Sequence, residues 1–168
     1  MFVEAGSVVP LQALLKGVII QSGNDASVAV AEHVAGSELA FTKLMNRYAS
    51  ALGMTRSSFS NPHGLTAEDH YTTATDLSRL AKALIAQFPG EYVWHQEKSY
   101  RHNNITQPNR NKLLWQDASV DGIKTGHTSA AGYCLVASAV RDGMRLISVV
   151  MGANDANTRA RQSKALLD

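Results

Sequence analysis

Residues 133–151 read YCLVASAVRDGMRLISVVM, and this stretch decides the fold. Two runs, Tyr133–Val140 and Arg145–Met151, are apolar at nearly every position. Asp142-Gly143, which lies between them, is a typical pair for a tight hairpin turn, so the stretch predicts two antiparallel strands. Because neither run alternates with polar residues, both faces of their sheet are expected to be covered, and helices are the natural cover.

The remainder of the chain supplies these helices. Apolar residues at helical spacing, or runs of small apolar residues, predict helices over residues 10–21 (interrupted by Gly17), 26–35, 37–52, 75–88 and 156–167. In the predicted helix over residues 26–35, valine and alanine lie on all sides, which indicates a helix buried among other helices. The residues expected to cap helix starts are Asn24 or Asp25, Ser37 and Thr75, and those expected to end helices are Gly53 and Pro89.

Together these elements give an α+β fold class, an antiparallel sheet flanked by helices with a helical subdomain. The helical part covers about residues 8–95, with a polar loop from Thr55 to about Thr73. The sheet part and the last helix cover about residues 96–168, beginning with short strands and loops such as EKSYRH and ITQPNRNKLLW. We expect one domain, or most of one, from a chain of this length.

Composition excludes several classes of function. The 168 residues carry a formal charge of +2, too small to indicate nucleic acid or a membrane surface as a partner. Cys134 is the single cysteine, so no internal disulfide can form, and it is expected to be a core residue rather than a nucleophile. No apolar run approaches the ~18 residues of a membrane span, and the first ten residues lack the pattern of a secretion signal.

Three features invite a chemical interpretation: Ser22-Gly23-Asn24 between two helices, Lys124-Thr125-Gly126 before the strands, and Arg159 on the last helix. A hydroxyl beside an ammonium can relay a proton, and a carboxamide can hold a substrate amide. Lysine, threonine and arginine together can bind a terminal carboxylate. If residues 120–127 form an edge strand, Lys124 and Gly126 point to one face and Thr125 to the other, unless a twist or bulge intervenes. A glycine on such a strand edge lets an extended ligand pair with the backbone. The pattern fits acyl transfer on a peptide that ends in a carboxylate.

Each feature also has an ordinary structural interpretation. SGN is a common turn or helix cap, KTG alone is a short polar triplet, and an arginine on a last helix is usually a surface residue. Their order and their separation of about one hundred residues favour the chemical interpretation. Penicillin-binding proteins and class A β-lactamases carry S-x-x-K, S-D-N and K-T-G in this order.

The chain resembles the low-molecular-mass penicillin-binding proteins, the serine-type D-alanyl-D-alanine carboxypeptidases. The resemblance extends over nearly all 168 residues, through GVIIQSGNDASVAVAEHVAGS, FSNPHGL, QPNRNKLLW, VDGIKTGHTSAAGYCLVASA and MRLISVVMGA. It implies a DD-peptidase/β-lactamase-like fold. It also implies an enzyme that removes the terminal D-alanine from peptidoglycan stem peptides through an acyl-enzyme, acts outside the cytoplasm and binds β-lactams.

The resemblance also implies roles for individual residues. Ser22 would move protons together with Lys124, and Asn24 would contact the substrate's amide. Gly126 would lie against the substrate, and the backbone N–H of His127 would be half of the oxyanion hole. Thr125 and Arg159 would hold the terminal carboxylate. No cofactor and no metal are implied, and no two histidines have the spacing of a zinc site.

One family element is missing from the sequence. No serine is followed three residues later by lysine, so the family's nucleophile and its base have no counterpart here. Ser22 is a poor substitute because the oxyanion hole would lack its second donor. We therefore expect a fragment, incomplete at its N-terminus, that is inactive alone, and whose exposed sheet edge could be covered by a second copy or a swapped segment.

Two other functions stay open at this point. A non-catalytic module that binds peptidoglycan peptides would use the same SGN and KTG residues. A β-lactamase is the nearest enzymatic rival, although nothing resembles its glutamate-bearing loop. The basic cluster in NRNKLLW is only weak support for a nucleic-acid site. Separately, His63 is expected to order the loop in which it lies.

Overall fold

A computed structural model describes all 168 residues, and its centre is a three-stranded antiparallel sheet. The strands β3 (Val120–Thr128), β4 (Gly132–Arg141) and β5 (Met144–Ala153) lie in the order β3-β4-β5. The predicted hairpin is confirmed, with strands slightly longer than predicted. Asp142 and Gly143 have φ values of 50° and 76°, which is the left-handed geometry that a tight hairpin turn requires.

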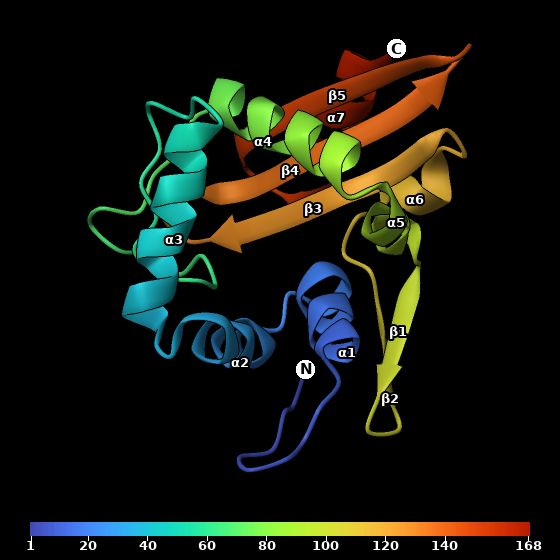
Figure 1. Ribbon diagram of the computed structural model, residues 1–168. Helices are drawn as coiled ribbons and strands as arrows, with labels where there is room; N and C mark the ends of the chain where they lie inside the picture. Colours follow the sequence, from blue (N-terminus) through green and yellow to red (C-terminus); the bar gives the residue numbers. More distant parts are fainter.

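Helices cover both faces of this sheet, as predicted. Helix α4 (Ala74–Gln87) crosses one face and α7 (Ala156–Leu167) packs on the other (Figure 1). The core on the α7 side contains Leu113, Leu114, Val120, Leu135, Ala137, Ala139, Ala160 and Leu167. The core on the α4 side contains Ala81, Tyr92 and Ile123, with Val136 and Ile147 packed against them. Successive residues of β4 thus enter different cores, which explains its continuous apolar run.

The helical part begins with α1 (Leu11–Lys16), which continues as the π-helical segment η1 (Gly17–Gln21). Helices α2 (Asn24–Ala35) and α3 (Glu38–Ala51) follow. The predicted interruption at Gly17 is therefore a change of helix type. The expectation that α2 is buried all round is wrong, because it packs along one stripe only: Ala26 and Ala31 are fully buried while Val34 is 54% exposed.

Helix caps are predicted with mixed success. Ser37 caps α3 through a hydrogen bond that its Oγ accepts from the N–H of Ala40, and Gly53 has the expected left-handed φ of 72°. Thr75 is wrong, because Thr73 accepts the capping hydrogen bond of α4 from the N–H of Asp76. Asn24 and Asp25 are also wrong, because Gly23 is the N-cap of α2. The Asp25 carboxylate instead accepts from the N–H of Val3, 2.7 Å away.

A run of short elements links the two parts: α5 (Pro89–Tyr92), the 3₁₀-helix η2 (Val93–Gln96), β1 (Ser99–His102), β2 (Ile105–Pro108) and α6 (Leu113–Gln116). Helix α4 ends at Gln87, and Pro89 opens α5. The β1-β2 hairpin lies beside η1, where the Gln21 amide donates to the Tyr100 carbonyl. None of the helices combines the length and the apolar character needed to cross a membrane.

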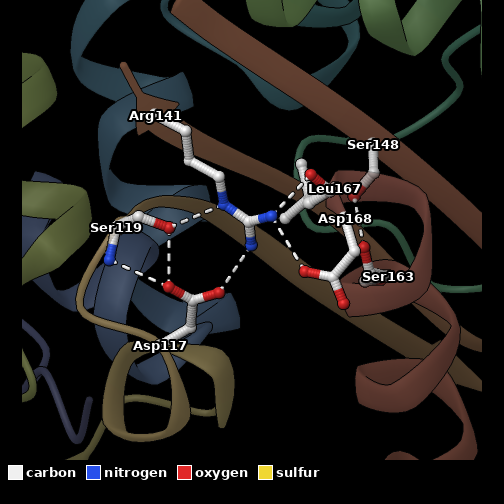
Figure 2. Close-up of polar contacts among 7 residues, drawn as sticks. All are labelled: Asp117, Ser119, Arg141, Ser148, Ser163, Leu167 and Asp168. Atoms are coloured by element: carbon white, nitrogen blue, oxygen red, sulfur yellow. Dashed lines mark hydrogen bonds and ion pairs between the residues drawn. The ribbon is translucent and has the colours of Figure 1, made fainter. Parts of the chain in front are cut away.

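Arg141, near the end of β4, joins three parts of the sheet layer (Figure 2). Its guanidinium donates to the Asp117 carboxylate and the Ser119 hydroxyl, which lie just before β3. It also donates to the Leu167 carbonyl and the Asp168 carboxylate at the end of α7. The start of β3 and the end of α7 are therefore held to the same strand. This arrangement fixes the platform that carries the candidate site.

Candidate active site

The first sequence triplet occupies the junction between η1 and α2. Ser22 has a φ of 56° and a ψ of 45°, a left-handed conformation that is uncommon for residues other than glycine and that clusters at functional sites. Lys124 Nζ donates a hydrogen bond to Ser22 Oγ, across 102 residues of sequence. The structure therefore brings the SGN and KTG triplets into direct contact. Asn24, the first residue of α2, is exposed, and its side chain makes no hydrogen bond within the chain.

Lys124 is partly buried between the sheet edge and the helical part, and it meets no carboxylate. Its ammonium also donates to the Thr125 carbonyl at 2.8 Å. Burial, and after it the charges of the nearby Arg110 and Arg159, together lower the pKa of Lys124 from 10.5 to about 8. An amine with this pKa exchanges protons readily near neutral pH, which is the property that a general acid–base group needs.

Strand β3 presents different side chains to its two faces. Lys124 pairs with Val136 of β4, whereas Thr125 and His127 pair with Leu135 and Tyr133. Directly opposed residues share a face, so Thr125 and His127 lie on the α7 side and Lys124 on the other, as the sequence predicted. Gly126 between them is exposed, and a Cβ there would meet nothing closer than 3.9 Å.

The first half of the outer edge of β3 is already occupied by side chains. Asn111 donates from its amide to the Gly122 carbonyl at 3.1 Å. His95 Nδ1 lies 2.9 Å from the Ile123 carbonyl, and since a carbonyl only accepts, this nitrogen carries the proton. Burial lowers the pKa of His95 and favours this neutral form. An extended ligand can therefore pair only with the second half of the edge, at residues 124–128.

Arg159 is a buried cation without an acidic partner. Its side chain is 5% exposed, and its guanidinium donates only to the carbonyls of Cys134 and Arg110, both at 3.3 Å. Its Nε has no partner. Burial lowers its pKa, yet a guanidinium stays ionised in proteins. A buried positive charge that is not neutralised is costly, so the position favours an anionic ligand.

Arg110 belongs to this site and was missed by sequence reasoning, which considered it only as part of a basic cluster. Its carbonyl accepts from Arg159, and its charge lowers the pKa of Lys124. The sequence shows only that this arginine lies between Asn109 and Asn111, and the structure adds that both asparagines are buried. The side chain of Arg110 is exposed, while its backbone lies between these two buried residues. Lys124, Arg110 and Arg159 form no ion pair with any carboxylate of the chain.

The surroundings of the site include one hollow and several residues with structural roles. A hollow of about 370 Å³ opens beyond His127, between the β3-β4 turn and Asn154.

His63 accepts a hydrogen bond from the N–H of Leu65, so its predicted role in ordering the loop is confirmed. Cys134 is only half-buried, so its prediction as a core residue is wrong. No group of three histidine, cysteine, aspartate or glutamate side chains converges as a metal site would need.

Comparison with known proteins gives a consistent result. The family model described as D-alanyl-D-alanine carboxypeptidase matches residues 1–155. The D-alanyl-D-alanine carboxypeptidase DacC of Escherichia coli is 52% identical over 168 residues, which is 99% of this chain and 42% of that protein. The chain thus spans less than half the length of this curated relative.

Two solved structures extend the comparison. Penicillin-binding protein 5 from Haemophilus influenzae superimposes with a TM-score of 0.96 at 46% identity, covering 99% of this chain and 49% of that one. Penicillin-binding protein D2 from Listeria monocytogenes, in its ampicillin-bound form, superimposes with a TM-score of 0.87 at 29% identity. That match covers 95% of this chain and 66% of the other. The α+β fold of penicillin-binding proteins is confirmed.

Proposed function

The chain belongs to the D-alanyl-D-alanine carboxypeptidase family, and from this premise we propose that it forms part of a serine-type enzyme that trims peptidoglycan stem peptides. The 168 residues would make up part of the penicillin-binding domain of a protein that acts outside the cytoplasm. The whole protein would remove the terminal D-alanine through an acyl-enzyme and would react with β-lactams.

One observation carries this proposal: three cations lie around the β3 edge with no carboxylate among them. Arg159 is buried and lacks an acidic partner, so the site favours binding of a negatively charged group that does not belong to the chain. The terminal carboxylate of a peptide supplies such a charge. Thr125 lies on the same face of the sheet as Arg159, and its hydroxyl, which has no other partner, would complete the carboxylate site.

The remaining residues then take roles in acyl transfer. Gly126 would let the peptide lie along the free half of β3, and the exposed Asn24 amide would hold the peptide's own amide. The backbone N–H of His127 would donate to the oxyanion that forms when a serine hydroxyl adds to the scissile carbonyl. Ser22 and Lys124, already hydrogen-bonded, would deliver the proton that the departing D-alanine amine must gain.

We propose further that a polypeptide of these 168 residues alone is not acylated. No serine in it is followed three residues later by lysine. Loss of a serine nucleophile costs about a millionfold in kcat in a well-studied serine protease, and the base would be lost too. Incubation with a fluorescent penicillin, followed by denaturing electrophoresis, should leave the chain unlabelled. A stoichiometric covalent label would refute the claim.

A non-catalytic peptide-binding module is the second candidate, because the same unpaired cations support it. Calorimetric titration with an acylated peptide ending in D-Ala-D-Ala, and with its C-terminal amide, tests carboxylate recognition. We expect binding of the acid, weaker binding of the amide, and loss of this preference in Arg159→Met. Arg161→Met, on the exposed face of the same helix, is the matched control. Equal binding of the two peptides, or none at millimolar concentration, would remove both carboxylate-based proposals.

A further inference from the structure

Tyr133 contacts two residues of the candidate site through a single aromatic ring. Its ring centroid lies 4.0 Å from that of His127, with the two planes tilted by 35°. The guanidinium carbon of Arg159 lies 5.7 Å from the same ring centroid. Tyr133 stands on β4, one strand in from the free edge, and none of the roles given above includes it.

The backbone fixes where this ring points. Tyr133 lies directly opposite His127 on β3, and it shares a face of β4 with Leu135, which packs in the α7 core. On its other side it pairs with Ala153, after an irregularity that adds one residue to β5. Gly152 sits in this bulge with a φ of 72°, a conformation that other residues rarely adopt. The ring is therefore placed by strand register and not by its own hydroxyl, which makes no hydrogen bond.

The Tyr133 ring can stabilise the buried Arg159 guanidinium without using its N–H donors. A guanidinium has five N–H donors, and any carboxylate of the chain that neutralised it would also occupy the donors that a ligand needs. The carbonyls of Cys134 and Arg110 accept from two of its nitrogens, and Nε stays without a partner. An aromatic face attracts a cation through its π electrons and takes up no N–H group. Tyr133 can thus hold the buried cation in place and leave it able to bind an anion.

We propose that Tyr133 is a positioning residue for carboxylate recognition. Its ring orients the Arg159 guanidinium from one strand away, and it restrains His127, whose N–H lies on the strand that receives the peptide. Tyr133 acts through these two residues and does not itself contact the peptide. This inference rests on the proposed function, because the anion in question is the terminal carboxylate of the peptide.

The test compares Tyr133→Phe with Tyr133→Leu in the same calorimetric titrations with the acid and amide peptides. Tyr133→Phe keeps the ring and loses only a hydroxyl without partners, so its affinity for the acid should stay within about twofold of wild type. Tyr133→Leu loses the cation–π contact and should bind the acid about tenfold more weakly. Binding of the amide should change little, since that peptide makes no use of Arg159.

Two controls separate positioning from loss of fold. Val150 pairs with Leu135 and not with Tyr133, so Val150→Ala removes buried apolar contacts from β5 and keeps the ring; it should lower the melting temperature and preserve the preference for the acid. If Tyr133→Leu does not fold, Tyr133→His at pH 8 takes its place, because a neutral imidazole attracts a cation less than a phenol ring. Its affinity for the acid should then fall below that of Tyr133→Phe.

The outcomes are distinguishable. A wild-type chain that prefers the acid, together with a ring-less variant that keeps the full preference, overturns the role of Tyr133 alone. A wild-type chain that does not distinguish the two peptides overturns the carboxylate site itself, and the role of Tyr133 falls with it. Loss of preference in Tyr133→Leu but not in Tyr133→Phe or Val150→Ala is the result that supports the inference.

Discussion

Replacing Lys124 by methionine tests the electrostatics of the site most directly. The pKa of this lysine falls from 10.5 to about 8 on folding, because the chain buries its ammonium and holds it near Arg110 and Arg159. A difference of this size between the folded and unfolded states corresponds to about 3 kcal/mol of lost stability when the lysine is charged. Methionine has a similar length and carries no charge, so it removes this cost.

The sign of the pH dependence follows from the two pKa values. Below pH 8 the lysine is charged in both states, and the full cost is present. Between pH 8 and 10.5 the folded state gives up its proton first, so the cost shrinks as pH rises. The unfolding free energy of the wild type minus that of Lys124→Met should therefore increase by about 2 kcal/mol between pH 7 and pH 9.5.

Urea unfolding followed by circular dichroism at these two pH values measures this difference. Taking the difference between two proteins cancels the titration of all other groups that they share. Lys43→Met is the matched control, because it replaces a lysine that is exposed on α3 and forms no ion pair. A Lys124→Met difference that stays constant within about 0.5 kcal/mol would show that the folded chain does not depress this pKa.

Three further predictions address binding, packing and the turn. A carboxylate bound near Lys124 favours its charged form, so affinity for the acid peptide should fall as pH rises through 8; calorimetric affinities that do not change from pH 7 to 9.5 contradict this. Leu135→Ala should cost about 2–5 kcal/mol in urea unfolding because Leu135 is 1% exposed, whereas Val140→Ala, on the exposed part of the same strand, should cost less than about 0.5 kcal/mol. Gly143→Ala should cost about 1 kcal/mol of unfolding free energy through its φ of 76° alone, since a Cβ there meets no atom within 4 Å. Gly90→Ala is the control, because Gly90 is equally uncrowded but has no positive φ, and it should cost less. Equal costs for the two variants would exclude the backbone explanation.

The features that the sequence predicts correctly depend on neighbours along the chain. The hairpin at Asp142-Gly143 needs only two residues with left-handed φ between two apolar runs. The Ser37 cap needs one hydroxyl three residues before the N–H of Ala40. The relative positions of Lys124 and Thr125 follow from the alternation of a strand. In each case the decisive interaction spans a few residues, so the local pattern is sufficient.

The predictions that fail involve competition between equivalent local choices or contacts with distant segments. Thr73 and Thr75 are equally good caps by chemistry, and the register of α4 selects the first. Asp25 could have capped α2, but its carboxylate binds the N–H of Val3, which no local pattern reveals. The left-handed Ser22 is likewise set by the π-helical end of η1 and by the contact with Lys124. Such choices are made by tertiary structure.

The candidate site shows the same difference between local and long-range interactions, because its chemistry comes from charges that are far apart in sequence. KTG and SGN could be recognised as triplets, yet nothing local shows that Lys124 loses its ordinary pKa. That shift needs burial and two arginines, Arg110 from the segment after β2 and Arg159 from α7, that the fold brings near Lys124. An uncompensated cluster of cations lowers the stability of the folded chain, and native proteins keep such costs mainly where a ligand offsets them. The unpaired cations therefore identify the site better than the two triplets do. A triplet that served only as a turn would not require unpaired cations near it.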